Sequence, residues 1–209
     1  TNLATKVSNS DEVHIGKKTI REDKNKISTV IVYNKPKGEI VSKKDPQGRK
    51  TIYDSLDHKY KHFLSVGRLD YASEGLLLLS DSVEIVDALM HSDLERVYKI
   101  KVNGVITKPV EQAMQNGLEI EDATGGAFKT TKIKSMSFAP FLAYDILTNG
   151  EKFSKIKVVI SEGKNRELRR FFAHFGLDVL DLKRLEYGGI SLNNLPTGKT
   201  RFLTKEEYK

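Results

Sequence analysis

The chain has 209 residues, of which 35 are Lys or Arg and 28 are Asp or Glu, so its formal net charge is +7. It contains no cysteine, which excludes a disulfide scaffold, a cysteine-ligated metal site and a thiol nucleophile. The longest apolar run, Leu76–Leu79, is far too short to span a membrane, and the positive charge favours a polyanionic partner such as nucleic acid.

Residues 1–26 differ in character from the rest of the chain. Val13-His14-Ile15 followed by Gly16 predicts a short strand and a turn, and the charged stretch from Arg21 to Lys26 is typical of a linker. This segment is too short to bury a core of its own. Because the first residue is Thr1 and not Met, we expect the native protein to extend upstream, with 1–26 as the remnant of a small N-terminal module.

From Ile27 onward the pattern becomes globular. Strands are predicted over Val30–Asn34, Leu76–Leu79, Val97–Val102, Lys129–Met136 and Lys155–Ile160, and helices over Ser82–His91 and from Lys108 to Met114. The helices interrupt the strands without the regular alternation of a βαβ fold. We therefore predict that 27–209 forms an α+β domain with a mixed, mostly antiparallel central sheet flanked by helices.

A further helix is predicted between Asn165, a candidate N-cap, and Gly176, a candidate terminator. Its apolar face would comprise Leu168, Phe171, Phe172 and Phe175. Arg166 and Arg170 fall on the opposite face, and Arg169 falls on the border, from which a side chain could reach into a cleft. The alternative is an ordinary amphipathic helix with a solvated basic face.

An Arg-x-Asp pair, Arg68 and Asp70, lies between Gly67 and Gly75 and immediately precedes the apolar strand. Glycines permit close backbone approach, and a carboxylate at the mouth of a buried strand is where a site would be built. The alternative is an aspartate that only caps a turn beside a surface arginine. The residues by themselves do not choose between the two.

Three motifs resemble those of the pseudouridine synthases, and among these the branch that modifies ribosomal RNA at single sites. They are Gly67-Arg68-Leu69-Asp70 with Ser73-Glu74-Gly75-Leu76-Leu77-Leu78-Leu79, then Glu95–Val102, then Glu162–Phe172, in the family's order. The stretches Asn34–Ile40 and Asp45–Asp54 are most similar to large-subunit (23S) enzymes of the B type. Lys6–Ile20 resembles the end of the RNA-binding module that often precedes this catalytic domain. One departure is Glu167, where glutamine is commoner.

The resemblance implies the pseudouridine synthase catalytic fold and the isomerisation of uridine, which requires no cofactor and no metal. The residues that it assigns are Asp70 as nucleophile, Tyr98 stacked on the base, Arg169 as the bidentate partner of Asp70, Arg68 as the side chain that fills the gap left by the flipped-out nucleotide, and Leu182 and Leu185 as pocket walls. The arginine would keep the carboxylate ionised inside a dry pocket.

Other basic residues are expected to hold RNA phosphates, with a solvated charge as the alternative for any one of them. They are Lys35, Lys37, Arg49, Lys164, Arg166, Arg170, Lys183 and Arg184. The expected partner is a stem-loop of 23S ribosomal RNA or a large-subunit precursor, acted on by a cytoplasmic monomer without a membrane partner. The alternatives are a 16S ribosomal RNA or tRNA substrate, and a non-catalytic RNA-binding factor of ribosome assembly.

Overall fold

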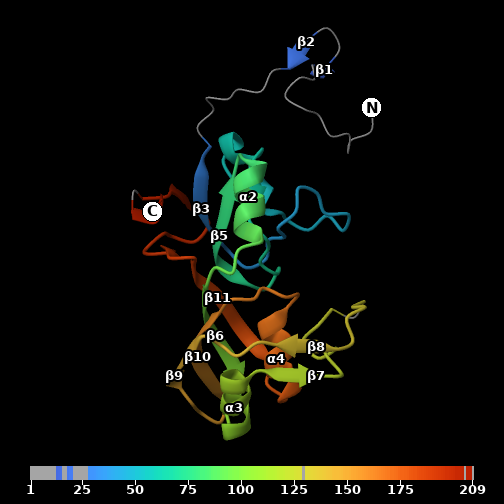
Figure 1. Ribbon diagram of the computed structural model, residues 1–209, viewed down its shortest axis with the longest axis vertical. Coiled ribbons are helices and arrows are strands. Elements are labelled where there is room, and N and C mark those ends of the chain that lie inside the picture. The colour runs from blue at the N-terminus through green and yellow to red at the C-terminus, as the bar shows by residue number, and fades with distance from the viewer. Residues whose placement is uncertain (1–12, 16–17, 21–27, 129, 205, 209) are drawn as a thin grey trace.

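The computed structural model describes residues 13–15, 18–20, 28–128, 130–204 and 206–208 (Figure 1). Its strands are β1 Val13–Ile15, β2 Lys18–Ile20, β3 Val30–Lys35, β4 Leu64–Ser65, β5 Glu74–Ser80, β6 Arg96–Asn103, β7 Leu118–Ile120, β8 Met136–Phe138, β9 Ala143–Thr148, β10 Phe153–Ile160, β11 Val179–Tyr187, β12 Ile190–Ser191 and β13 Thr200–Phe202. Its helices are α1 Ile52–Ser55, α2 Val83–Met90, α3 Lys108–Asn116 and α4 Glu167–His174, with 3₁₀ turns at His58–Tyr60 and Glu206–Tyr208.

One sheet dominates the described part of the chain, with strand order β13-β3-β5-β11-β6-β10-β9 and with β4 and β12 attached to β5 and β11. Every neighbouring pair in it is antiparallel except β5 and β11, which run parallel. The predicted α+β fold with a mixed, mostly antiparallel sheet is therefore confirmed. No helix among the described residues is long and apolar enough to cross a membrane.

The strand β5 is buried on both faces because its sequence is aliphatic almost throughout. Leu77 and Leu79 face the larger hydrophobic cluster, to which α1, α3 and α4 contribute, whereas Leu76 and Leu78 face a smaller cluster that includes Val86 of α2. All four leucines have no exposed surface. The predicted buried strand is confirmed, and it places the preceding loop, with Asp70, at one end of the core.

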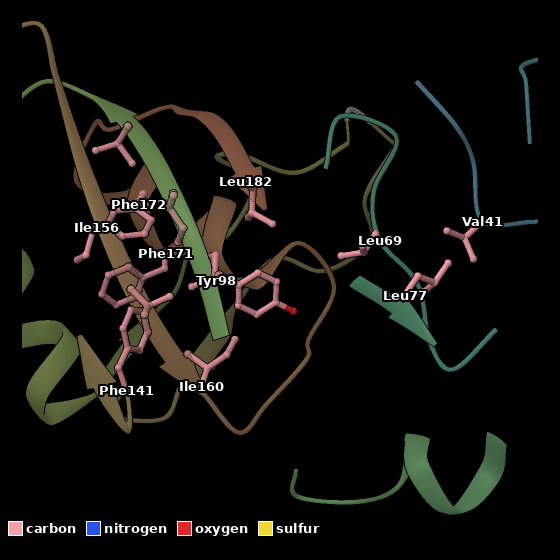
Figure 2. Packing of buried hydrophobic residues seen from close by; sticks show 14 of the residues in the cluster. Val41, Leu69, Leu77, Tyr98, Phe141, Ile156, Ile160, Phe171, Phe172 and Leu182 are labelled. Atoms are coloured by element: carbon pink, nitrogen blue, oxygen red, sulfur yellow. The ribbon is translucent and has the colours of Figure 1, made fainter. Parts of the chain in front are cut away.

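The helix α4 covers the sheet with the predicted apolar face. Phe171 and Phe172 are fully buried and lie beside Ile156 of β10 (Figure 2). Gly176, with φ 73°, follows the last turn and confirms the predicted end of the helix. The predicted N-cap is wrong: Asn165 lies one residue too early, and the capping position belongs to Arg166 in the left-handed conformation, with φ 52°.

Of the predicted strand Lys129–Met136, the described residues 130–135 do not form a strand. Only Met136 belongs to one, at the start of β8, and Ile133 is 39% exposed in the loop before it. The reason is that this loop lies against α4 and no neighbouring strand runs beside it; Ile133 supplies its carbonyl to Arg170 instead. We call residues 121–128 and 130–135 the α4 loop because Arg166 and Arg170 donate hydrogen bonds to it.

At the N-terminal end the structure describes two short strands. β1 and β2 pair antiparallel, with Val13 opposite Ile20, which confirms the predicted strand, whereas the predicted turn at Gly16 lies outside the described residues. The rest of the 1–26 segment lies outside the described residues. Its identity as the remnant of an RNA-binding module stays a prediction.

Candidate active site

A cavity of about 220 Å³ lies where three segments far apart in the sequence meet. They are the loop before β5, the strand β6 and the segment that leads into α4, with β11 closing the floor. The predicted residues that line it are Arg68, Asp70, Tyr98, Lys164, Arg166, Arg169, Leu182 and Arg184. The fold thus assembles the three sequence motifs around one space.

Asp70 contacts two guanidinium groups through one oxygen. Nη1 of Arg166 donates a hydrogen bond to Oδ2 at 3.2 Å, and Nε of Arg169 lies 3.4 Å from the same Oδ2. The expected bidentate pairing of Arg169 is therefore wrong, because its other nitrogens are used elsewhere. No described residue bonds Oδ1, so this oxygen is available to a substrate.

The protein holds Arg169 through both terminal nitrogens of its guanidinium. Nη1 donates to the carbonyl of Val179 at 3.0 Å, and Nη2 donates to the carbonyl of Ala72 and to Oγ of Ser73 at 3.3 and 3.1 Å. The side chain is buried, as its predicted position on the border of the helix allows. Burial, and then the nearby Arg166, lower the pKa of this guanidinium. Arg169 thus ties α4 both to the Asp70 loop and to the start of β11.

Arg166 reaches Asp70 because of two features that sequence reasoning missed. Its left-handed backbone turns the side chain toward the cavity before the helix begins. The α4 loop then holds the guanidinium, since Nε donates to the carbonyl of Gly126 at 2.6 Å and the group lies 4.4 Å from the ring centroid of Phe128. A Cβ on Gly126, whose φ is +67°, would overlap the carbonyl oxygen of Arg169, so the close approach requires glycine.

Arg170 does not lie on an RNA-binding surface. Arg170 is 1% exposed, and its guanidinium bonds the carbonyl of Ala123 at 2.5 Å and Oγ1 of Thr131 at 2.9 Å, which fastens the α4 loop. The predicted RNA contact of Arg170 is therefore wrong, and so is the alternative of a solvated basic face. A helix position alone does not show that a loop distant in sequence will cover it.

Lys35 is fully buried beneath the Asp70 loop. Its ammonium donates to the backbone carbonyls of Pro36, Asp70 and Ser73 at 2.9, 3.2 and 2.9 Å. Burial lowers the pKa of Lys35 to about 8. The expected phosphate contact is wrong, because the three donors of the ammonium are used inside the fold. Lys35 instead fixes the backbone that carries Asp70.

Tyr98 is 7% exposed and lies on the wall of the cavity. It projects from β6 near Ile160 and Leu182, with its hydroxyl directed away from the phenylalanines of α4 (Figure 2). Leu182 thus takes the predicted wall position. Leu185 is not part of the cavity lining, and it lies at an irregularity of β11 where the pairing with β6 passes from Arg184 to Glu186.

Arg184 is also part of the wall, and it is buried, with 3% exposure. Its Nε donates to the carbonyl of Leu76 at 2.7 Å, and its Nη2 is buried without a hydrogen-bond partner among the described residues. This arrangement leaves Nη2 enclosed by the protein, with the guanidinium 5.3 Å from the ring centroid of Tyr187. Arg184 therefore lies in the cavity wall, and the expected phosphate contact at the surface is wrong.

Glu167 lines the cavity and forms an acidic pair with Glu162. Oε2 of Glu167 accepts a hydrogen bond from the backbone N–H of Lys164 at 3.0 Å. Burial, with a further contribution from Glu162, raises the pKa of Glu167 to about 7. Nζ of Lys164 forms an ion pair with Glu162 at 2.9 Å. A glutamine at position 167 would keep the acceptor without the buried charge.

The remaining predicted residues are dispersed. Arg68 is exposed at the cavity rim. Lys37 and Arg49 lie outside the cavity lining and form ion pairs with Asp181 and Asp45. Lys183 faces away from the cavity. Among the described residues no group of three or more His, Asp or Glu could hold a metal ion.

Residues 29–174 match the family model described as RNA pseudouridylate synthase, and the chain belongs to that family. It is 58% identical over 206 residues to an uncharacterised RNA pseudouridine synthase of Helicobacter pylori (strain ATCC 700392 / 26695), covering 99% of this chain and 79% of that protein. It is 34% identical over 212 residues to the ribosomal large subunit pseudouridine synthase B of Bacillus subtilis (strain 168), covering 100% and 80%.

Among solved structures, one described as the crystal structure of a pseudouridylate synthase superposes with a TM-score of 0.70. The identity is 25%, and the match covers 97% of this chain and 81% of the other. The fold and the family indicated by the three motifs are therefore confirmed, and the chain is an RNA pseudouridine synthase, which is an isomerase.

Proposed function

We propose that this synthase isomerises one uridine of 23S ribosomal RNA to pseudouridine, with Asp70 as the nucleophile. The observation that carries the proposal is Asp70 itself: one carboxylate oxygen bound by two arginines, the other unbonded, at the wall of a cavity shared with Tyr98. The 34% identity to a protein named ribosomal large subunit pseudouridine synthase B supports the large-subunit RNA as the substrate.

The charge of the cavity supports a polyanionic substrate. Its lining contains six cationic side chains, Arg68, Arg96, Lys164, Arg166, Arg169 and Arg184, and two acidic ones, Asp70 and Glu167. Such an excess of positive charge draws phosphate toward the opening and stabilises it there. A uridine within a helix cannot reach Asp70, so the nucleotide must leave its stack.

In the proposed reaction, Oδ1 of Asp70 attacks C1′ of the flipped-out ribose and the bond from C1′ to N1 breaks. The uracil anion turns within the cavity, C5 forms a bond to C1′, and the carboxylate leaves. The proton on C5 is removed and N1 takes up a proton, so no atom is gained or lost. Enclosure in the cavity holds the freed base close to C1′ while it turns.

The surrounding side chains have separate roles in this proposal. Arg166 and Arg169 keep Asp70 ionised before attack and stabilise it again as a leaving group. Tyr98 stacks on the uracil, and the exposed Arg68 enters the space that the flipped nucleotide leaves in the RNA. Arg184 adds positive charge to the cavity wall.

The test is to map pseudouridine in cellular RNA by carbodiimide-blocked primer extension. Cells carrying the wild-type protein are compared with cells carrying Asp70→Ala, and Asp57→Ala serves as an exposed control outside the cavity. We expect Asp70→Ala to lose one stop in 23S RNA. Loss in 16S RNA or tRNA would overturn the proposed substrate, and an unchanged map would overturn the role of Asp70.

Purified protein separates binding from chemistry. We expect Asp70→Ala to bind the mapped RNA with an affinity within about threefold of the wild type, because the phosphate contacts remain. Its pseudouridine yield should be undetectable. Turnover by Asp70→Ala would show that another group attacks the sugar.

A further inference from the structure

Five lysines stand on the face of the central sheet that is turned away from the cavity. They are Lys99 and Lys101 of β6, Lys155 and Lys157 of β10, and Lys183 of β11. Successive side chains of a strand point to opposite faces. Since Tyr98 and Leu182 line the cavity, Lys99 and Lys183 lie on the other side. We call this set the lysine face.

The strand register places lysine opposite lysine. Lys99 is the partner of Lys157 on β10 and of Lys183 on β11, and Lys101 is the partner of Lys155. Directly opposed residues of antiparallel strands lie about 5 Å apart, and like charges at this distance destabilise a sheet. The repeated opposition of lysines therefore lowers the stability of the sheet.

Compensating acidic groups are few around the lysine face. Asp181 stands opposite Lys101, Asp145 stands opposite Lys157, and Glu74 of β5 stands opposite Lys183. The carboxylate of Asp181 is already paired with Lys37. Among the described residues none of the five lysines forms an ion pair within 4.0 Å.

An aromatic ring lies within this charged surface. Phe153 is 40% exposed, and the ammonium groups of Lys101 and Lys155 lie 4.3 and 5.8 Å from its ring centroid. A positively charged surface with an exposed aromatic ring is the combination by which proteins bind nucleic acid strands without sequence preference. Protein–protein interfaces, by contrast, are depleted in lysine, so the composition favours RNA over a protein partner.

We propose that the lysine face is a second RNA-binding surface, which holds the phosphates of a segment other than the one that enters the cavity. The proposal rests on the proposed function for its substrate, a long folded RNA. Its energetic basis is that phosphates relieve the repulsion between the opposed lysines on binding. A short hairpin that occupies the cavity would not reach this face.

The test uses Lys99→Gln/Lys157→Gln, two exposed positions on opposed strands. The control is Lys59→Gln/Lys199→Gln, which makes the same change in net charge at exposed positions outside the cavity and the lysine face. Binding to a full-length 23S transcript and to a hairpin of about 20 nucleotides is measured over a range of salt concentrations.

We expect the lysine-face variant to bind the transcript more weakly, with a slope of log affinity against log salt smaller by about 1.4 to 1.8, the value for two lost phosphate contacts. Its hairpin affinity should equal that of the control. Its melting temperature should rise, because the opposed charges are gone.

A transcript affinity and salt slope equal to those of the control would overturn the proposal, and would leave the face to solvent or to an acidic protein. An equal loss for hairpin and transcript would also overturn it, since no second surface would then be involved. The measurement is of equilibrium binding and does not depend on turnover, so a failure here is distinct from a failure of the Asp70 assignment.

Discussion

Arg166 donates from Nη1 to Oδ2 of Asp70 at 3.2 Å, the same oxygen that Arg169 approaches at 3.4 Å. The two arginines are held differently. Arg169 is bonded by fixed backbone groups around it, whereas Arg166 is bonded by the α4 loop through Gly126. The two arginines that contact Asp70 are therefore held by separate groups, and each arginine can be replaced without removing the contacts of the other.

Replacing Arg169 with alanine should lower both stability and turnover. The substitution leaves the carbonyl of Val179 and Oγ of Ser73 without this donor and removes a cation from the buried site. We expect a loss of about 2 to 4 kcal/mol in the free energy of unfolding. Urea denaturation followed by circular dichroism measures it. Wild-type stability in the variant would contradict the structural role assigned to Arg169.

Replacing Arg166 with asparagine should lower turnover with little effect on stability. Asparagine tolerates the left-handed conformation of this position, so the start of α4 is preserved while one cation on Oδ2 is lost. We expect unfolding free energy within about 1 kcal/mol of the wild type and a fall in kcat of about tenfold or more. Single-turnover assays at saturating enzyme measure the chemical step. Unchanged kcat would exclude a part for Arg166 in the reaction.

Glu167→Gln should stabilise the protein at neutral pH. The pKa of Glu167 is about 7 in the fold against an ordinary value of 4.5, so between these values the folded state binds more protons than the unfolded state. Stability of the wild type therefore falls as pH rises through this window, and glutamine removes the fall. The variant should equal the wild type near pH 4.5 and exceed it by on the order of 3 kcal/mol above pH 7.

The measurement is urea denaturation of both proteins at several pH values from 4.5 to 8. A difference between the two proteins that does not vary with pH would show that the buried carboxyl of Glu167 is not the cause.

Gly75→Ala should disrupt the junction between β5 and β11. A Cβ at Gly75, where φ is +105°, would overlap the backbone of Arg184, the residue opposite it in the parallel pair. We expect a loss of about 3 kcal/mol or more. Gly48→Ala is the control, because Gly48 also has positive φ but a Cβ there meets nothing within 4 Å. It should cost only about 1 to 2 kcal/mol. Equal thermal shifts for the two variants would refute the steric explanation.

The hydrophobic pattern of the sequence does not predict the strand β11. Val179–Tyr187 lies at the centre of the sheet, yet its sequence contains Asp181, Lys183, Arg184 and Glu186 and does not have the pattern of a buried strand. Its charged residues are accommodated because some line the cavity and others reach the opposite face. Both environments are created by strands distant in sequence.

The apolar strand Leu76–Leu79, the apolar face of α4 and the three family motifs could be predicted before any fold was known, because each is a property of nearby residues in the chain. The folded chain was needed to show that Lys35 and Arg170 are buried, that Arg166 reaches Asp70, and that lysines oppose one another across β6. These depend on desolvation and on strand register, which are set by contacts between segments far apart in the chain.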